Sequence, residues 1–149
     1  MEVNYFGVIQ TTVTLLPLIR KSTNGGVIVN VSSLVGSNTF ISNPNRKFGA
    51  GSPANTNRLV AYSSSKAAIN SYTINLAHEL REEGIKVNAV TPGLTSTSLS
   101  GGVGKTTRAG AEVLLPWALL DKDGPTGMRL EWALNISVGW RFGLDRSFY

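Results

Sequence analysis

Two short runs of β-branched residues, separated by one long helical pattern, constrain the fold of this chain most strongly. The first run is Val-Ile-Val-Asn-Val at residues 27–31, and the second is Ile-Lys-Val-Asn-Ala-Val at residues 85–90. Runs of this kind are typical of strands that are buried on both faces of a parallel sheet. A helix between two such strands returns the chain to the same end of the sheet, so the sequence predicts an α/β fold.

Three stretches have the periodicity of helices. Residues 4–20 predict a largely buried helix whose last turn is kinked by Pro17, residues 61–82 a helix with one apolar face, and residues 109–120 a further helix. Only two strong strands are found, and two strands cannot close a doubly wound sheet by themselves. We therefore expect a partial Rossmann-like doubly wound parallel sheet. Either the chain is a piece of a larger fold, or it needs a partner to cover its open strand edge.

Composition excludes several classes of protein. With 149 residues, 42% hydrophobic and 15% charged, the chain has the material of one globular domain. No apolar stretch approaches the roughly 20 residues of a membrane span, and the N-terminus lacks a signal pattern, so we expect a cytoplasmic protein. The net charge of +5 is scattered, which argues against nucleic-acid binding. Since there is no cysteine and only one histidine, His78, no metal site is expected.

Tyr62 and Lys66 are four residues apart within the predicted helix at 61–82, so their side chains lie on one face. A tyrosine has a reference pKa of about 10 and is a poor acid or base at neutral pH. A neighbouring ammonium group favours the phenolate and lowers that pKa, as general acid–base catalysis requires. The same spacing is common on helix surfaces, where it reflects packing alone, so the pair indicates catalysis only together with other motifs.

Four motifs occur in one order along the chain. They are Val-Asn-Tyr-Phe-Gly at 3–7, Val-Asn-Val-Ser-Ser at 29–33, Tyr-Ser-Ser-Ser-Lys at 62–66 and Val-Asn-Ala-Val-Thr-Pro-Gly at 87–93. In this order the chain resembles the short-chain dehydrogenase/reductase (SDR) family. The third motif is similar to the family's YxxxK signature. The others are similar to its asparagine-bearing helix, its strand ending in an active-site serine and its PG turn beside the nicotinamide.

The resemblance implies an oxidoreductase that interconverts small-molecule carbonyls and alcohols with a nicotinamide cofactor. Tyr62 would exchange a proton with the substrate oxygen, and Lys66 would lower the pKa of Tyr62 and bond the nicotinamide ribose. Ser33 would hydrogen-bond the substrate oxygen, and Asn4 would hold a water that relays protons to Lys66. From the residues alone, the favoured interpretation is structural: Ser33 as a strand-end or helix-cap hydroxyl and Asn4 as an N-cap. Ser32 is the alternative serine.

The resemblance also implies a cofactor site after the second strand. Pro92 and Gly93 would turn the backbone close to the nicotinamide, while Leu94 and Thr97 would touch its carboxamide and phosphates. The insertion at residues 36–59 is similar to insertions of carbonyl-reductase-like members, which tilts the expected cofactor to NADP, with NAD possible. Family members often form homo-oligomers through the helices that begin here near Asn4 and Ala61.

The family's glycine-rich TGxxxGxG turn does not occur in these 149 residues. Residues 1–127 are therefore interpreted as the C-terminal, catalytic part of an SDR Rossmann domain, truncated at the N-terminus, and residues 128–149 as an atypical C-terminal tail. Without the glycine-rich half there is no adenosine site. The alternative to an active oxidoreductase is consequently an inactive SDR fragment that lacks its dinucleotide-binding half.

A phosphate-loop interpretation is the runner-up among enzymes, because residues 101–107 read Gly-Gly-Val-Gly-Lys-Thr-Thr. The GxxxxGK[ST] pattern requires glycine at position 99, where this chain has Leu99, and it requires a strand directly before the loop. We therefore expect that ATP with magnesium does not raise the melting temperature of the chain in a thermal-shift assay. A clear rise would favour a nucleotide triphosphatase.

Overall fold

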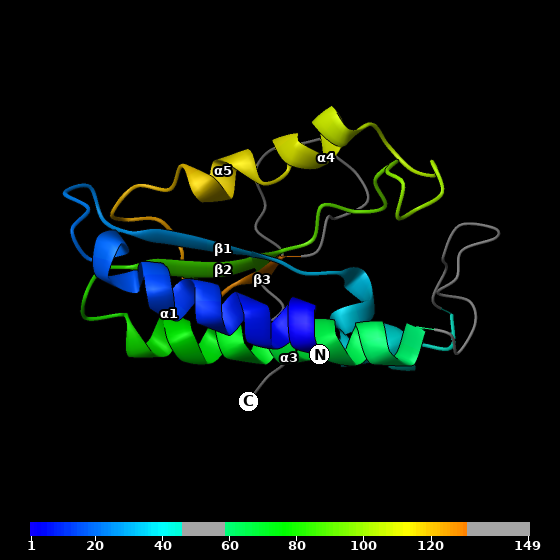
Figure 1. The fold of residues 1–149 in the computed structure, drawn as a ribbon, viewed down its shortest axis with the longest axis horizontal. Helices are drawn as coiled ribbons and strands as arrows, with labels where there is room; N and C mark the ends of the chain where they lie inside the picture. Colours follow the sequence, from blue (N-terminus) through cyan, green and yellow to red (C-terminus); the bar gives the residue numbers. More distant parts are fainter. Residues whose placement is uncertain (46–58, 131–149) are drawn as a thin grey trace.

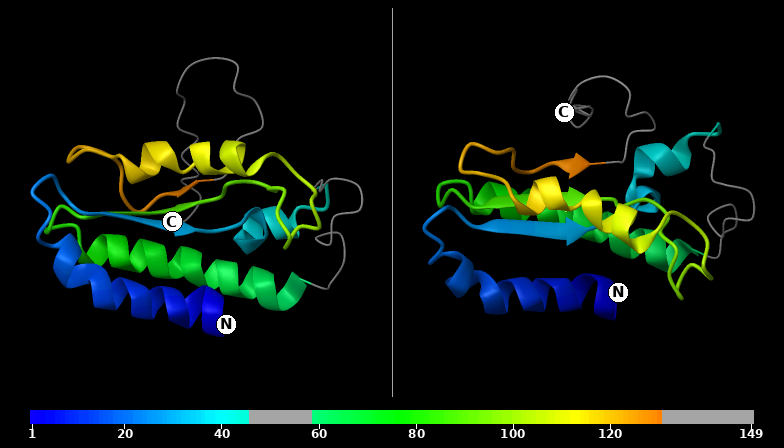
Figure 2. Two further views of the ribbon diagram at one scale, coloured as in Figure 1. Left: turned by 45° about the horizontal axis from the view of Figure 1, so that its top comes forward. Right: turned by 90° about the horizontal axis from the view of Figure 1, so that it is seen from above.

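A parallel sheet lies between two layers of helices in the computed structural model, which describes residues 1–45 and 59–130 (Figure 1). In chain order the elements are the π-helical turn η1 (Glu2–Phe6), α1 (Gly7–Ile19), β1 (Val27–Val31), the 3-10 turn η2 (Leu34–Gly36), α2 (Asn38–Ser42), α3 (Val60–Glu79), β2 (Lys86–Val90), α4 (Thr107–Glu112), α5 (Leu115–Ala118) and β3 (Arg129–Leu130). Helices α1 and α3 run side by side on one face of the sheet, and α4 and α5 cover the other (Figure 2). The expected α/β class with a parallel, Rossmann-like sheet is confirmed.

The strand order among the described residues is β1-β2-β3, and all neighbours are parallel. Strand β1 pairs with β2 over its whole length, from Val27 opposite Lys86 to Val31 opposite Val90. The carboxyl ends of both strands therefore lie at the same end of the sheet, where ligands bind in open α/β sheets.

The main core lies between the sheet and α3. Its buried residues are Ile28, Leu76, Ala77, Leu80, Ile85 and Val87, and Leu16 and Ile19 of α1 pack at its margin with Tyr72. One face of α3 is apolar as predicted, since Ile69, Leu76 and the C-cap residue Leu80 are buried. The chain leaves α3 through Gly84, whose φ of 70° is the left-handed conformation expected of a helix stop.

A third strand extends the sheet beyond the two that the sequence predicts. Asn88 is fully buried in β2, and its side-chain amide donates to the carbonyl of Pro125 at 2.9 Å and accepts from the backbone N–H of Met128 at 3.0 Å. Thr126 Oγ1 accepts from the N–H of Val87 at 3.0 Å. These bonds hold the segment after Pro125 along β2, so β3 forms from only two residues. Strand β3 lies within the predicted tail at 128–149, whose remainder falls outside the described residues.

The prediction that residues 27–31 are buried on both faces is wrong for β1. Ile28 and Asn30 are buried against α3, but Val27 and Val29 are only half-buried and Val31 is 46% exposed. Among the described residues, the second face of β1 is covered by the short helix α5, which is shorter than the strand (Figure 2). In β2 the prediction is confirmed, since Val87 to Val90 are all buried.

The helix at the N-terminus also differs from its prediction. Instead of one largely buried helix from residue 4, a π-helical turn precedes α1, and only Thr12 of α1 is buried. Helix α1 reaches the core through Leu16 and Ile19, whereas Val13 and Leu18 point away from it. The apolar residues of α1 therefore form a second apolar face, which no other described element covers.

Two further segments differ in their local structure. Residues 38–42, expected to be loop, form α2, because Ser37 caps the helix by accepting a hydrogen bond from the N–H of Phe40 at 3.1 Å. The expected helix at 109–120 is divided into α4 and α5, since Pro116 has no N–H to continue the hydrogen-bond ladder and stands at the start of the second helix. Residues 46–58 of the predicted insertion lie outside the described residues.

We expect Leu80→Ala to lower the free energy of unfolding by about 2–5 kcal/mol, because it removes fully buried methyl groups and leaves a cavity. Leu18, which is 64% exposed on α1, provides the matched control. Leu18→Ala should change the free energy of unfolding by less than about 0.5 kcal/mol. Urea denaturation of both variants measures the difference, and equal losses would contradict this placement of the core.

Candidate active site

The structure brings Tyr62 and Lys66 together on the first turns of α3. The Lys66 Nζ atom lies 5.7 Å from the centroid of the Tyr62 ring. The same ammonium group donates a hydrogen bond of 2.8 Å to the backbone carbonyl of Val31, the last residue of β1. Lys66 is therefore held between the helix that carries the tyrosine and the strand end that leads to Ser33.

Burial lowers the pKa of Lys66 below its ordinary value of 10.5, because the half-buried ammonium loses part of its hydration. The carbonyl of Val31 partly replaces that hydration as a neutral hydrogen-bond acceptor. A lysine whose pKa is lowered releases its proton more readily than an exposed lysine, which suits a group that passes protons to a neighbouring tyrosine.

Asn4 lies within η1 and contacts α3. Its side-chain amide donates to Ser65 Oγ at 3.2 Å, and Ser65 Oγ donates to the backbone carbonyl of Tyr62 at 2.7 Å. The N-cap interpretation of Asn4 is wrong, because Met1 occupies the N-cap position of η1. Asn4 is thus connected through one hydroxyl group to the helical turn that carries Tyr62.

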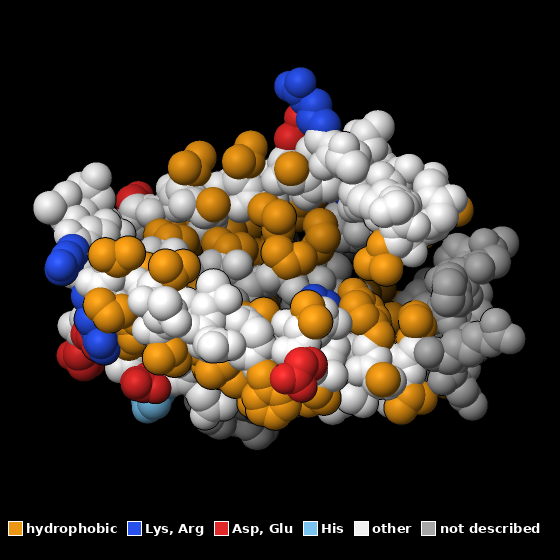
Figure 3. All heavy atoms as spheres, in the orientation of Figure 1, with side chains coloured by type: hydrophobic (Ala, Val, Ile, Leu, Met, Phe, Trp, Pro, Cys, Tyr) orange, Lys and Arg blue, Asp and Glu red, His pale blue; other side chains and the backbone are white. Residues whose placement is uncertain are grey.

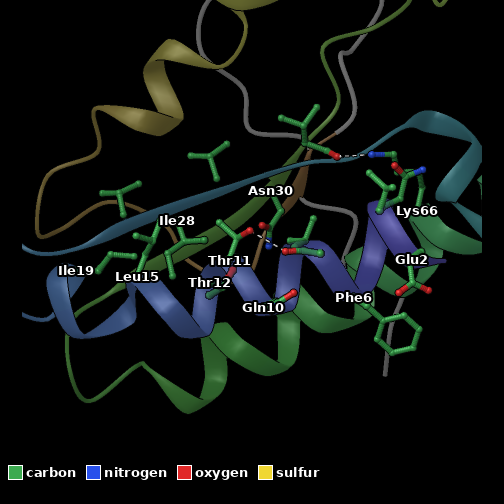
Figure 4. Close-up of a pocket in the computed structure, with 17 residues that line it drawn as sticks. Glu2, Phe6, Gln10, Thr11, Thr12, Leu15, Ile19, Ile28, Asn30 and Lys66 are labelled. Carbon is green, nitrogen blue, oxygen red and sulfur yellow. Dashed lines mark hydrogen bonds between the residues drawn. The ribbon is translucent and has the colours of Figure 1, made fainter.

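A groove of about 840 Å³ separates η1 and α1 from β1 (Figure 4). Glu2 and Lys66 line one end of it, and Leu15, Ile19 and Ile28 line the other. Asn4 is also among the residues that line the groove. The space-filling view shows apolar side chains along the hollow between the α1 layer and the α5 layer (Figure 3). Lys66 therefore borders an open groove that Asn4 also lines, as a solvent route to the lysine would require.

Ser33 stands at the beginning of η2 in extended conformation, with φ of −151° and ψ of 151°. It is half-buried, and its hydroxyl makes no capping bond to η2, so the helix-cap alternative is not observed. The neighbouring Ser32 is buried, and its Oγ donates to Asn70 Oδ1 at 2.5 Å. Because Ser32 is engaged in this internal bond, the geometry favours Ser33 as the serine that meets a substrate.

The turn after Ser33 lies directly against α3. A Cβ atom added at Gly36 would come within 2.8 Å of both the carbonyl carbon and the Cβ of Lys66. Glycine is thus required for η2 to approach the helix this closely. This contact places the serine turn and the Tyr62–Lys66 pair at one end of the sheet.

The predicted cofactor residues follow β2 at the same end. The N–H of Ser32 donates to the carbonyl of Val90 at 2.9 Å, so Pro92 and Gly93 leave the sheet beside the serine turn. Gly93 has a φ of 80°, which side-chain-bearing residues rarely adopt. Leu94 is exposed and its carbonyl accepts from the N–H of Lys105 at 3.1 Å.

Thr97 belongs to a separate turn, where its N–H donates to Ser100 Oγ at 2.9 Å. Within the described ranges, no contact joins Thr97 to the Tyr62–Lys66 pair. The glycine-rich run that follows does not come directly from a strand, because β2 ends at Val90 and α4 begins at Thr107. Hydrogen bonds within the segment, such as those from the N–H of Lys105 to the Leu94 carbonyl and from the N–H of Gly102 to the Thr97 carbonyl, close it into a loop.

Sequence reasoning missed two residues near the site. The Lys105 side chain returns to the turn after β2, with its Nζ 3.6 Å from where a Cβ of Gly93 would lie. Asn70 joins the two ends of the serine turn to α3. Asn70 carried a sequence signal, since it follows Lys66 by four residues and so shares its helix face. Lys105 carried none, because eleven residues separate it from Gly93 along the chain.

Among residues 1–45 and 59–130, no three His, Asp or Glu side chains gather as a metal site would require. In the same ranges no helix is both long and apolar enough to cross a membrane. What the site offers is acid–base chemistry: a phenol, an ammonium with a lowered pKa, and a hydroxyl at the carboxyl end of a parallel sheet. Fold and site together define an α/β protein with a candidate acid–base site at the carboxyl end of its parallel sheet.

A family model described as Enoyl-(Acyl carrier protein) reductase matches residues 1–117. Salutaridine reductase of Papaver somniferum is 33% identical over 155 residues, which cover 85% of this chain and 49% of the poppy enzyme. The 17-beta-hydroxysteroid dehydrogenase type 2 of Homo sapiens is 37% identical over 123 residues, covering 83% of this chain and 24% of the human protein. The chain belongs to the short-chain dehydrogenase/reductase family.

Solved structures agree with this assignment. The structure of the Papaver somniferum salutaridine reductase superposes with a TM-score of 0.71, covering 85% of this chain and 52% of the reductase. A short chain dehydrogenase from Salmonella enterica, 29% identical, superposes with a TM-score of 0.61 over 86% of this chain and 49% of its own. This chain spans about half the length of these relatives.

The lowered pKa of Lys66 has a consequence for stability. Between the folded pKa and 10.5, the unfolded chain holds a proton on Lys66 that the folded chain has released. Stability therefore rises with pH through this window. We expect the free energy of unfolding, measured by urea denaturation at a series of pH values approaching 10.5 from below, to rise more steeply in the wild type than in Lys66→Met. Parallel curves would contradict the burial of the ammonium.

Proposed function

We propose that Tyr62, Lys66 and Ser33 form the acid–base site of an NAD(P)H-dependent oxidoreductase that reduces a carbonyl group or oxidises an alcohol. The observation that carries the proposal is the position of the Lys66 ammonium, 5.7 Å from the Tyr62 ring and bonded to the strand end before Ser33. An ammonium beside a phenol ring favours the phenolate form of that phenol. The pair therefore combines a proton-donating hydroxyl with a neighbouring positive charge.

In the reductive direction, the Tyr62 hydroxyl gives its proton to the substrate oxygen, and the Ser33 hydroxyl donates a hydrogen bond to the same oxygen. The nicotinamide, when bound, supplies the hydride that goes to the carbonyl carbon. Tyr62 recovers its proton from Lys66, which is reprotonated from water in the groove that Asn4 lines. Oxidation of an alcohol runs through the same groups in reverse.

The residues after β2 fit a phosphorylated dinucleotide. The left-handed Gly93 lets the backbone approach a flat ring closely, and the Lys105 side chain puts a positive charge beside that turn. Pro92, Gly93 and Leu94 would hold the nicotinamide with Tyr62 and Lys66, and Thr97 would reach the phosphates. NADP is the proposed cofactor, with NAD possible. A related oxidoreductase of Brucella ovis, 26% identical, was solved in complex with a partially ordered NAD.

The proposed substrate is a small molecule with a carbonyl or alcohol group, and the proposed location is the cytoplasm. We also propose a homo-oligomer that pairs through α1 and α3. Both helices expose apolar side chains to solvent, among them Val13 on α1 and Ile74 on α3. Contiguous exposed apolar area marks protein contact surfaces.

We expect Tyr62→Phe to lower the rate of carbonyl reduction by about 10²–10⁴-fold, because the proton donor is removed while the ring remains. Affinity for NADPH, followed by fluorescence titration of the full chain, should change little. Tyr72→Phe is the matched control, since its hydroxyl lies on the same helix but bonds Thr12. Absence of NADPH binding at millimolar concentration would refute the proposed function and leave the family assignment intact.

A further inference from the structure

One buried amide connects the serine turn to the helix of the proposed acid–base pair. Asn70 lies on α3 four residues after Lys66 and is only 6% exposed. Its Oδ1 accepts from Ser32 Oγ at 2.5 Å, and its Nδ2 donates to the carbonyl of Gly36 at 3.0 Å. Both polar ends of the amide are therefore used inside the protein.

The two partners of this amide flank the turn that carries Ser33. Ser32 comes immediately before Ser33, and Gly36 closes η2 by donating its N–H to the Ser33 carbonyl at 2.9 Å. Since a carbonyl can only accept, Nδ2 must face Gly36 and Oδ1 must face the Ser32 hydroxyl. The amide orientation is thus determined, and one side chain grips the turn at both ends.

The position of the turn relative to α3 depends on this grip. Lys66 holds the strand side of the turn through the carbonyl of Val31, and Gly36 touches the Lys66 backbone directly. The Ser33 hydroxyl itself has no bond to another described side chain that would place it. The position of the Ser33 hydroxyl therefore depends on the position of the turn, and the turn is held by Asn70.

We propose that Asn70 is a positioning residue that sets the Ser33 hydroxyl against Tyr62 and Lys66 by clamping the turn from Ser32 to Gly36. This role rests on the proposed function, but the clamp itself is a property of the folded chain. An amide is required because the site needs one acceptor and one donor. Aspartate keeps the acceptor and turns an oxygen toward the Gly36 carbonyl, while leucine removes both bonds.

The chain provides a control with the same kind of bond further from the site. Asn30 of β1 donates to Thr73 Oγ1 at 2.9 Å, which also joins a buried strand residue to α3. Thr73→Val removes that hydrogen bond and leaves the grip on the serine turn intact. A loss of general stability should therefore affect Thr73→Val and Asn70→Asp alike, whereas a loss of positioning should affect only the latter.

The test measures amide hydrogen exchange by NMR and steady-state kinetics on the full-length variants Asn70→Asp, Asn70→Leu, Ser32→Ala and Thr73→Val. We expect the Gly36 and Ser37 amides of the first three variants to exchange about tenfold faster relative to the β1 amides, because each loses at least one grip on the turn. Their kcat for NADPH-dependent carbonyl reduction should fall about 10–100-fold, with KM for NADPH nearly unchanged. Thr73→Val should show neither effect.

Two results would overturn the proposal. The first is unchanged exchange of Gly36 and Ser37 in Asn70→Asp and Ser32→Ala, which are the variants that perturb packing least. The second is a kcat loss in Thr73→Val that equals the loss in Asn70→Asp. If the wild type has no turnover, the proposed function fails, and the exchange pattern alone still decides whether Asn70 clamps the turn.

Discussion

The attachment of β1 to α3 by polar groups is the interaction on which the rest of the structure depends. Asn30 bonds Thr73, Ser32 bonds Asn70, and the Val31 carbonyl receives the Lys66 ammonium. Buried hydrogen bonds specify register more strictly than apolar contacts, because an unpaired buried group costs about 1–3 kcal/mol. A shift of α3 along the strand would leave several of these groups unpaired at once. The two bonds at the end of the strand, from Ser32 to Asn70 and from Lys66 to the Val31 carbonyl, thus also locate the proposed acid–base pair.

Much of this arrangement was predictable from local patterns. The β-branched runs specified β1 and β2, and the spacing of Tyr62 and Lys66 placed them on one face of a helix that does form. These features depend on residues close in the chain, where periodicity carries the information. The family resemblance then supplied roles that no periodicity contains.

Features that depend on distant residues could not be predicted in this way. Strand β3 has only two residues, which is too short for a strand pattern in the sequence. It forms because Asn88 and Val87 hydrogen-bond the segment from Thr126 to Met128. The exposure of α1 depends on what lies next to it, which hydrophobicity along the helix does not report. The role of Asn70 could not be predicted either, because the sequence does not show that Ser32 and Gly36 both contact this one position on α3.

The close contact at Gly36 limits how this site can change. The turn and α3 are separated by the space of a hydrogen atom, since a methyl group at residue 36 would overlap the Lys66 backbone. Any side chain at residue 36 would therefore displace α3 from the turn, so varying this residue alone would not place a new side chain in the site. Side-chain changes are more easily accommodated in the loop after Gly93, where Leu99 is 93% exposed and Val103 is 60% exposed. Substitutions can therefore accumulate in the loop after Gly93, whereas the contact between residue 36 and α3 tolerates almost none.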